Sequence, residues 1–433
     1  MNAIKEMMKM LTSSHSTFHV VKNIKDRLLD EGFVPLDEKD SFHLELGKKY
    51  FVTRNDTSII AFYIPEKLDD FHMQITATHN DSPSFKLKPN PVKKSYNLIE
   101  LNVEPYGGGI YNTWLDKPLS IAGRVYVQEK NRISSCLLDI DEDLLVIPNV
   151  CIHMNREINS GYRYNPAVDL LPIMGEWKDD FDFNEYLLKK LKKKSGKVIS
   201  HDLFLYNREK PALIGMNHEF LSSGREDDLT ATYSALFGFM DARSEKHISV
   251  FASFDNEEVG SLTKQGAQST FLMDNIKRII KCLGGKDDDY EKAMAQSFML
   301  SIDNAHANHP NHPELSDKTT NVMMNKGIVI KYNANQSYTS DALSSSLVKC
   351  LCNENGICYQ EYTNRSDLRG GSTLGNLSES MVSIATVDIG IAQLAMHSSY
   401  ETLGSKDIQD MVTLTKAFFS KNIVLADSDI ILL

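Results

Sequence analysis

The sequence predicts an α/β fold built on a mixed, largely parallel sheet with helices on both faces. Along residues 221–433, runs typical of buried strands alternate with amphipathic helical segments. Such alternation indicates a parallel sheet whose strands are joined by helices. The composition, with 42% hydrophobic and 24% charged residues, is that of an ordinary globular protein. A chain of 433 residues suggests two or three domains, or one large domain with an insertion.

The first predicted elements are one helix and two strands. Apolar residues between Phe18 and Leu28 recur at helical spacing, and Gly32 stands where a helix C-terminal cap is expected. Apolar runs at 58–64 and 73–79 then predict two strands.

The pattern changes after residue 93, where short β segments replace the α/β pattern. We therefore expect a mostly β domain, residues 94–211, inserted into an α/β domain formed by residues 1–93 and 212–433. The family resemblance given below implies that this insertion serves dimerisation and assembly. Its predicted elements are strands at 98–103, 119–128 and 135–147 and a helix at 183–194.

The remainder of the chain carries the alternating pattern. Helices are predicted at 229–240, 271–283, 340–352 and 408–419, and strands at 248–254, 298–303, 328–331 and 382–389.

Charge and hydropathy exclude several classes of protein. A net charge of -11 disfavours nucleic acid, whose binding depends on Lys and Arg at phosphates. No apolar run approaches the ~18 to 20 residues of a membrane span. The first residues lack a signal-peptide layout, so we expect a cytoplasmic protein. The six cysteines are scattered without paired CxxC spacing, which predicts reduced thiols rather than a zinc finger.

Potential metal ligands follow several predicted strands. Glu257 and Glu258 stand at the end of one strand. An isolated Glu-Glu pair is typical of a solvated turn. Adjacent carboxylates, however, repel each other unless a cation or a shared proton lies between them. Because sites in α/β sheets form beyond the carboxyl ends of strands, these groups are expected to converge. The other groups are His79 and Asp81, Asp227 and Asp228 before a helix, Asp303 and His306, and His397.

Two histidines and three carboxylates fit a pair of divalent cations bridged by one carboxylate. Oxygen and nitrogen ligands without thiolate suit Zn²⁺, with Mn²⁺ or Co²⁺ as alternatives. Asp81 is placed to accept the second N–H of a ligating His79. In the glutamate pair, one residue can bind metal while the other accepts a proton from a metal-activated water.

With these residues assembled, the chain resembles the aspartyl aminopeptidase family, dinuclear zinc metallopeptidases that act on peptide N-termini. The resemblance implies a zinc-aminopeptidase-like fold and runs nearly end to end. Its motifs are Thr78-His79-Asn80-Asp81-Ser82-Pro83, Gly107-Gly108-Gly109-Ile110-Tyr111-Asn112-Thr113-Trp114, Asp255-Asn256-Glu257-Glu258-Val259-Gly260-Ser261, Asp303-Asn304-Ala305-His306-Ala307-Asn308-His309-Pro310, Lys326-Gly327-Ile328-Val329-Ile330-Lys331, Gly371-Ser372-Thr373-Leu374-Gly375 and Gln393-Leu394-Ala395-Met396-His397-Ser398.

The resemblance implies a role for each site residue. The family's Arg-Leu-Asp-Asn-Leu stretch corresponds to Arg225-Glu226-Asp227-Asp228-Leu229, which places Asp227 at the bridging position and leaves Asp228 as the alternative. It also implies a cis peptide between these two aspartates. The implied assignments are His79 and Asp303 to one metal, Glu258 and His397 to the other, Asp227 to both, Glu257 as general base, Asp81 as the residue that orients His79, and His153 as a residue that reaches a neighbouring subunit's site.

The same resemblance implies a peptide substrate and an oligomer. Lys331 and Tyr338 match positions near the substrate, and His306 and His309 match family histidines that contact it or the ligands. We expect the protein to release an N-terminal residue, preferably Asp or Glu, from peptides. We also expect a homo-oligomer built from dimers, such as a dodecamer. Neither nucleic acid nor membrane is expected as a partner. The alternatives are a related dinuclear hydrolase, such as an aminopeptidase for neutral residues or a deacylase, and a non-catalytic oligomeric scaffold.

Overall fold

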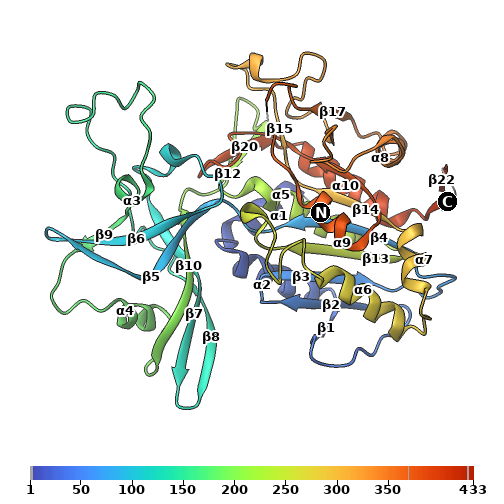
Figure 1. Cartoon of the computed structure of the whole chain (residues 1–433), viewed down its shortest axis with the longest axis horizontal. Helices are drawn as coiled ribbons and strands as arrows, with labels where there is room; N and C mark the ends of the chain where they lie inside the picture. The colour runs from blue at the N-terminus through green and yellow to red at the C-terminus, as the bar shows by residue number, and fades with distance from the viewer. Residues whose placement is uncertain (1–2, 369, 427–428) are drawn as a thin grey trace.

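The computed structural model describes residues 3–368, 370–426 and 429–433. The chain forms two lobes, which lie side by side in Figure 1. The lobe at the right contains a nine-stranded sheet with helices, and the lobe at the left contains a six-stranded sheet.

The nine-stranded sheet has the order β1-β2-β3-β13-β4-β14-β18-β16-β17. Its central pairings β13–β4, β4–β14 and β14–β18 are parallel, whereas β2–β3, β3–β13 and β16–β18 are antiparallel. The strands are β1 (Val34–Leu36), β2 (Lys49–Arg54), β3 (Ser58–Tyr63), β4 (Met73–His79), β13 (Ile248–Phe254), β14 (Phe298–Ile302), β16 (Ile328–Tyr332), β17 (Tyr359–Thr363) and β18 (Ala385–Gly390).

Helices cover both faces of this sheet, which confirms the predicted fold class. Alternate residues of β3 enter different cores: Ile59 and Ala61 pack on one face, Ile60 and Phe62 on the other. Among the described residues, no helix has the length and apolar character needed to span a bilayer. The first face carries α1 (Ala3–Ser13), α2 (Thr17–Asp30), α5 (Glu226–Asp241), α8 (Ala342–Glu354) and α10 (Asp407–Ser420), and the second carries α6 (Phe271–Cys282), α7 (Asp289–Gln296) and α9 (Leu374–Val382).

The second lobe is an antiparallel sheet of order β8-β7-β10-β5-β6-β9 with its own apolar core. The expected boundary at residue 93 falls inside β5, which pairs with β6 from Ser84 onward. The elements are β5 (Ser84–Ser95), β6 (Leu98–Tyr106), β7 (Leu119–Glu129), β8 (Arg132–Asp139), β9 (Ile173–Glu176), β10 (Lys197–Asn207), α3 (Pro166–Asp169) and α4 (Phe183–Lys190).

A third, five-stranded sheet of order β11-β12-β20-β19-β15 lies beside the two lobes, near the top of Figure 1. It supports the loop that joins β19 to β20. Its strands are β11 (Ala212–Ile214), β12 (Phe220–Ser223), β15 (Ala305–His306), β19 (Ala392–Leu394) and β20 (Glu401–Gly404), and the hairpin strands β21 (Ile423–Ala426) and β22 (Asp429–Leu432) pair near the C-terminus.

Several elements differ from the sequence prediction. The predicted strand at 135–147 ends at Asp139, and the strand predicted from residue 382 starts at Ala385 because α9 extends to Val382. β5 was not predicted because Pro89 and Pro91 argue against a strand. The ladder accommodates both prolines in an irregular stretch between its paired residues 87 and 92.

Candidate metal centre

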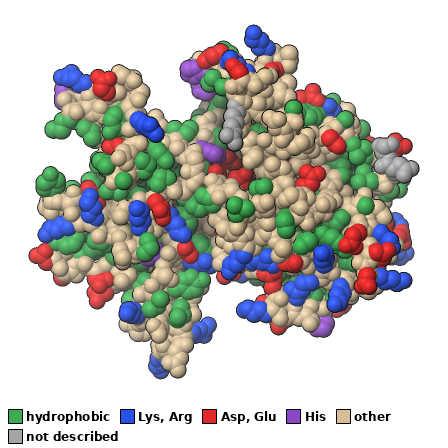
Figure 2. Space-filling model, viewed as in Figure 1, with side chains coloured by type: hydrophobic (Ala, Val, Ile, Leu, Met, Phe, Trp, Pro, Cys, Tyr) green, Lys and Arg blue, Asp and Glu red, His purple; other side chains and the backbone are tan. Residues whose placement is uncertain are grey.

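Parallel strands bring the predicted ligands to one edge of the sheet. Phe254 pairs with His79 across β13 and β4, so the Glu257–Glu258 turn begins beside His79. Ile302, the last residue of β14, directly precedes Asp303. These groups reach a recess between the lobes, where acidic and histidine side chains gather in Figure 2.

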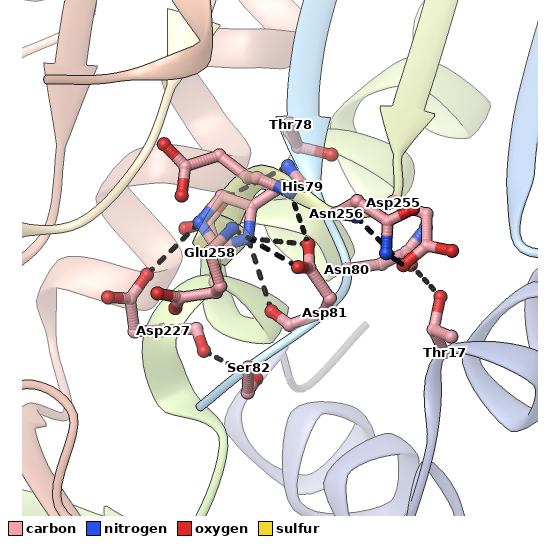
Figure 3. A network of polar contacts seen from close by, with 12 residues as sticks. Thr17, Thr78, His79, Asn80, Asp81, Ser82, Asp227, Asp255, Asn256 and Glu258 are labelled. Atoms are coloured by element: carbon pink, nitrogen blue, oxygen red, sulfur yellow. Dashed lines mark hydrogen bonds and ion pairs between the residues drawn. The ribbon is translucent and has the colours of Figure 1, made fainter. Parts of the chain in front are cut away.

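Asp227 lies between the two histidines. His79 Nε2 is 3.3 Å from Asp227 Oδ1, and His397 Nε2 is 3.4 Å from Asp227 Oδ2. The backbone at Asp227 and Asp228 departs from helical geometry at the start of α5, and the peptide between them is cis, as predicted. Each oxygen of one carboxylate therefore faces a different imidazole (Figure 3 shows Asp227 and His79).

His397 approaches from the loop between β19 and β20. Its Nε2 lies 3.5 Å from Glu258 Oε2, while its Nδ1 donates to the carbonyl of Gly108 at 3.0 Å. The His397 backbone N–H donates to Glu401 Oε1, and the Asp227 N–H donates to Oε2 of the same carboxylate. The carbonyl of Gly108 in the second lobe thus fixes the His397 imidazole, and the buried Glu401 carboxylate fixes the His397 backbone.

Asp303 and Asp228 lie on the other side of the cluster. One ligand atom from each of His79, Asp227, Asp228 and Asp303 lies within 4.8 Å of the others. Asp228 Oδ2 accepts the His79 backbone N–H at 3.4 Å. Asp228 is therefore near His79, whereas Asp227 faces both histidines.

Lys331 is attached to the segment that carries Asp303. Its Nζ donates to the carbonyls of Asp303 and Asn304 at 2.7 and 3.3 Å, and it lies 3.6 Å from Asp303 Oδ1. The side chain is only 2% exposed. The Tyr338 ring lies 5.2 Å from the Lys331 ammonium.

Asp81 organises the opposite side of the cluster, as Figure 3 shows. Its Oδ1 accepts the Glu257 N–H at 3.1 Å and lies 3.4 Å from His79 Nδ1, while its Oδ2 accepts the Glu258 N–H at 3.2 Å. The left-handed φ of 63° at Asn256 turns the chain so that both N–H groups point at Asp81. Asp81 therefore contacts His79 and the glutamate turn together, because its backbone carbonyl also accepts a hydrogen bond from His79 Nδ1 at 3.1 Å.

The cluster contains buried oxygens that lack donors. Among the described residues, Asp227 Oδ1, Asp228 Oδ1 and Glu258 Oε1 are buried and accept no hydrogen bond. Buried carboxylate oxygens normally accept hydrogen bonds. Where N–H donors are missing, a bound cation provides the compensating positive charge. The donor set of carboxylate oxygens and imidazole nitrogens fits zinc, which the cluster can hold.

Burial and crowding of the carboxylates raise the pKa values of two glutamates in the cluster. Burial, together with nearby Asp303 and Asp81, raises the pKa of Glu257 to about 8 despite the opposing charge of His79. Burial likewise raises the pKa of Glu258 well above its ordinary value. A bound cation lowers such pKa values because it stabilises the charged carboxylate.

The remaining predicted residues lie outside this cluster. His306, on β15, and Tyr338 both contact the ring of Tyr362. His309 bonds with Asn311 in an exposed loop and, among the described residues, no bond joins it to the cluster.

His153 is exposed in the loop between β8 and α3, which projects from the second lobe (Figure 1). No hydrogen bond links its side chain to the metal cluster within the described part of the same chain. The fold of one chain therefore leaves it apart from the other site residues.

Sequence reasoning missed Tyr106, Glu401 and the carbonyl of Gly108. Tyr106 bonds with Asp81, Glu401 with the backbone of Asp227 and His397, and Gly108 with His397. The glycine run at 107–109 belongs to a motif that carries the family resemblance, but that resemblance assigned no contact with the metal centre to it. Tyr106 and Glu401 carry no local pattern of their own.

The two-lobed fold and the oxygen–nitrogen cluster at its sheet edge define a metallohydrolase with a zinc-aminopeptidase-like fold. Residues 10–419 match the family described as aminopeptidase I zinc metalloprotease (M18). The chain belongs to this family and is a metal-dependent aminopeptidase, a hydrolase of the exopeptidase class. The predicted resemblance and enzyme class are confirmed, and the alternative of a non-catalytic scaffold is not supported.

Individual relatives match over nearly the whole chain. A probable M18 family aminopeptidase 2 of Clostridium novyi (strain NT) is 44% identical over 423 residues, 96% of this chain and 98% of that protein. A chain in the cryo-EM structure of the Ape4 and Nbr1 complex is 35% identical with a TM-score of 0.93, covering 96% of this chain and 85% of that chain. The mApe1 dodecamer of S. cerevisiae is 27% identical with a TM-score of 0.84, covering 96% of each chain.

Proposed function

We propose that this aminopeptidase binds two divalent cations, preferably Zn²⁺, and releases N-terminal Asp or Glu from peptides. The observation that carries the proposal is the position of Asp227, whose two oxygens face His79 and His397 separately. In this assignment Asp303 joins His79 at one ion, Glu258 joins His397 at the other, and Asp227 bridges them. Mn²⁺ and Co²⁺ suit the same donors.

We assign the proton transfers to Glu257. When bound, the cations polarise the scissile carbonyl and activate a water as nucleophile. One potential ligand atom from each of Glu257, His79 and Glu258 lies within 4.8 Å of the others, so the Glu257 carboxylate lies beside two proposed ligands. It accepts the proton of the attacking water and passes it to the departing amine, and Asp81 holds the turn that carries it.

The preference for acidic residues is supported by a cation beside the ligands. The Lys331 ammonium lies 3.6 Å from Asp303 Oδ1 and 5.2 Å from the ring of Tyr338, so a positive charge stands next to the proposed ligand Asp303. A substrate carboxylate placed there is attracted by the ammonium, whereas a neutral side chain lacks this attraction. Because Lys331 already bonds to two carbonyls, the aminopeptidase for neutral residues remains the second candidate.

Matched substrates test the preference. Asp and Asn, like Glu and Gln, have nearly the same shape and differ in charge, so p-nitroanilides of the four residues isolate the electrostatic contribution. We expect kcat/KM for Asp and Glu to exceed that for Asn and Gln by at least about tenfold, equal to about 1.4 kcal/mol. Equal values, or faster release of Leu than of Asp and Glu, would favour the second candidate.

We further propose that the second lobe, residues 84–207, assembles the oligomer and that His153 acts in the site of a neighbouring subunit. The supports are the exposure of its loop, where Val150, Ile152 and Met154 are 48, 48 and 84% exposed, and the dodecamer formed by the S. cerevisiae relative. Large exposed apolar side chains in one loop are typical of a surface covered by a partner.

Mixed oligomers test the shared site. His153→Ala and Glu257→Gln chains should each be inactive alone, yet regain activity when co-assembled, because some sites then combine an intact His153 with an intact Glu257. The readout is specific activity against the mixing ratio, with unmixed oligomers as controls. Mixtures that stay inactive despite verified co-assembly would show that each chain needs its own His153.

A further inference from the structure

We propose that Tyr106 is a positioning residue of the metal centre, through which the second lobe fixes His79 and the glutamate turn. The inference rests on the proposed function, since it concerns the orientation of the proposed ligands. Tyr106 is the last residue of β6, yet its hydroxyl donates to Asp81 Oδ2 at 2.7 Å. Its ring packs edge-on against Phe204 of β10, with centroids 5.4 Å apart. The second lobe thus holds the ring, and the first lobe receives the hydroxyl.

The direction of this hydrogen bond follows from its neighbours. Asn256 Oδ1 accepts from Thr263 Oγ1 at 2.8 Å and from Gln265 Nε2 at 2.9 Å. The Asn256 amide nitrogen therefore points the other way and donates to the Tyr106 hydroxyl at 2.8 Å. Because that hydroxyl accepts from Asn256, its single proton is available for Asp81.

Asp81 depends on this proton. Its two oxygens receive the N–H groups of Glu257 and Glu258, and Oδ1 lies 3.4 Å from His79 Nδ1, which also donates to the Asp81 backbone carbonyl at 3.1 Å. Without the hydroxyl, Asp81 Oδ2 keeps only the Glu258 N–H, and the half-buried amide of Asn256 keeps only the weaker contact with Asp255 Oδ1 at 3.3 Å. The Asp81 carboxylate is then held only by the Glu257 and Glu258 N–H groups, so it is fixed less firmly beside the His79 imidazole.

The chain just after Tyr106 controls the other histidine. The Gly108 carbonyl accepts from His397 Nδ1, and the Ile110 N–H donates to the His397 carbonyl at 2.9 Å. Gly107 has a φ of 73°, and a Cβ there would lie 3.1 Å from Glu258 Cβ. Residues 106–110 of one segment therefore orient both imidazoles, one through Asp81 and the other directly.

The test compares Tyr106→Phe with Tyr126→Phe in the intact oligomer. Tyr126 lies in β7 of the same lobe and belongs to none of the metal centre's hydrogen bonds given above. Zinc affinity is measured by competition with a chromophoric chelator, and the visible spectrum of the Co²⁺-loaded protein reports ligand geometry. Removing an outer partner of a ligand costs roughly 10- to 100-fold in metal affinity. Because Tyr106 acts on His79 through Asp81, we expect a loss near the lower end of that range for Tyr106→Phe, an altered Co²⁺ spectrum, and no change for Tyr126→Phe.

A second variant separates positioning from simple support of the fold. Asn256→Gly keeps a residue suited to the left-handed φ but removes the amide that orients the hydroxyl, so a smaller loss of zinc affinity is expected. A Tyr106→Phe protein with a lower Tm but unchanged zinc affinity and Co²⁺ spectrum would overturn the inference. Failure of the proposed function would appear separately, as a wild-type protein that binds no zinc or releases no amino acid.

Discussion

Replacing Glu257 with glutamine is expected to lower kcat by at least about 100-fold while both zinc ions stay bound. General acid–base catalysis contributes roughly 10²- to 10⁴-fold, equal to about 3 to 5 kcal/mol of barrier. Glutamine has nearly the shape of glutamate but cannot accept the proton of the attacking water. Its backbone N–H still donates to Asp81, so the turn and the neighbouring ligand Glu258 are retained.

The measurement combines steady-state kinetics with zinc analysis of the dialysed protein. Glu209→Gln is the matched control, since its carboxylate pairs with Lys117 outside the metal cluster. Near-normal kcat in Glu257→Gln would refute the role as base. A loss of zinc together with activity would instead make Glu257 a ligand.

Asp227→Ala is expected to lose both zinc ions, whereas Asp228→Asn keeps them. The Asp227 carboxylate is the group that faces both histidines, at 3.3 and 3.4 Å, so its removal deprives both proposed ions of a shared ligand. Asp228 contacts the His79 backbone, a bond that asparagine can retain. The pair of variants therefore separates the two candidates for the bridging position.

Zinc stoichiometry after dialysis provides the readout, and thermal unfolding provides a second one. Chelation should lower the Tm of the wild-type protein, because the carboxylates around Asp227 are left to repel one another in a buried site. Asp227→Ala should unfold at a temperature that is insensitive to chelator. If Asp227→Ala kept two zinc ions and Asp228→Asn lost them, Asp228 would be the bridging ligand instead of Asp227.

The structure changes the interpretation of Lys331. The family resemblance implied a position near the substrate, and the structure shows that Nζ bonds to the carbonyls of Asp303 and Asn304. Lys331 thus supports the segment that carries the proposed ligand Asp303, and its ammonium is buried there. A substitution there is expected to affect both zinc binding and selectivity, which is why matched substrates are the sharper test.

The sequence by itself determined the α/β class and most of the groups at the metal centre. Buried strands have an apolar pattern that is local, and polar residues stand at their ends, as His79 does in β4 and Asp303 just after β14. Parallel strands then bring such residues to one sheet edge whatever the details of the packing. The glutamate pair was visible for the same reason, because it directly follows a strand end.

Only the tertiary structure decided what holds these ligands in place. Tyr106, Gly108 and Glu401 contact the centre from distant parts of the chain, and nothing local distinguishes them from other tyrosines, turn glycines or glutamates. The direction of the Lys331 side chain was hidden in the same way. Sequence patterns report burial and periodicity along one segment, whereas these contacts depend on how two lobes meet, which no single segment encodes.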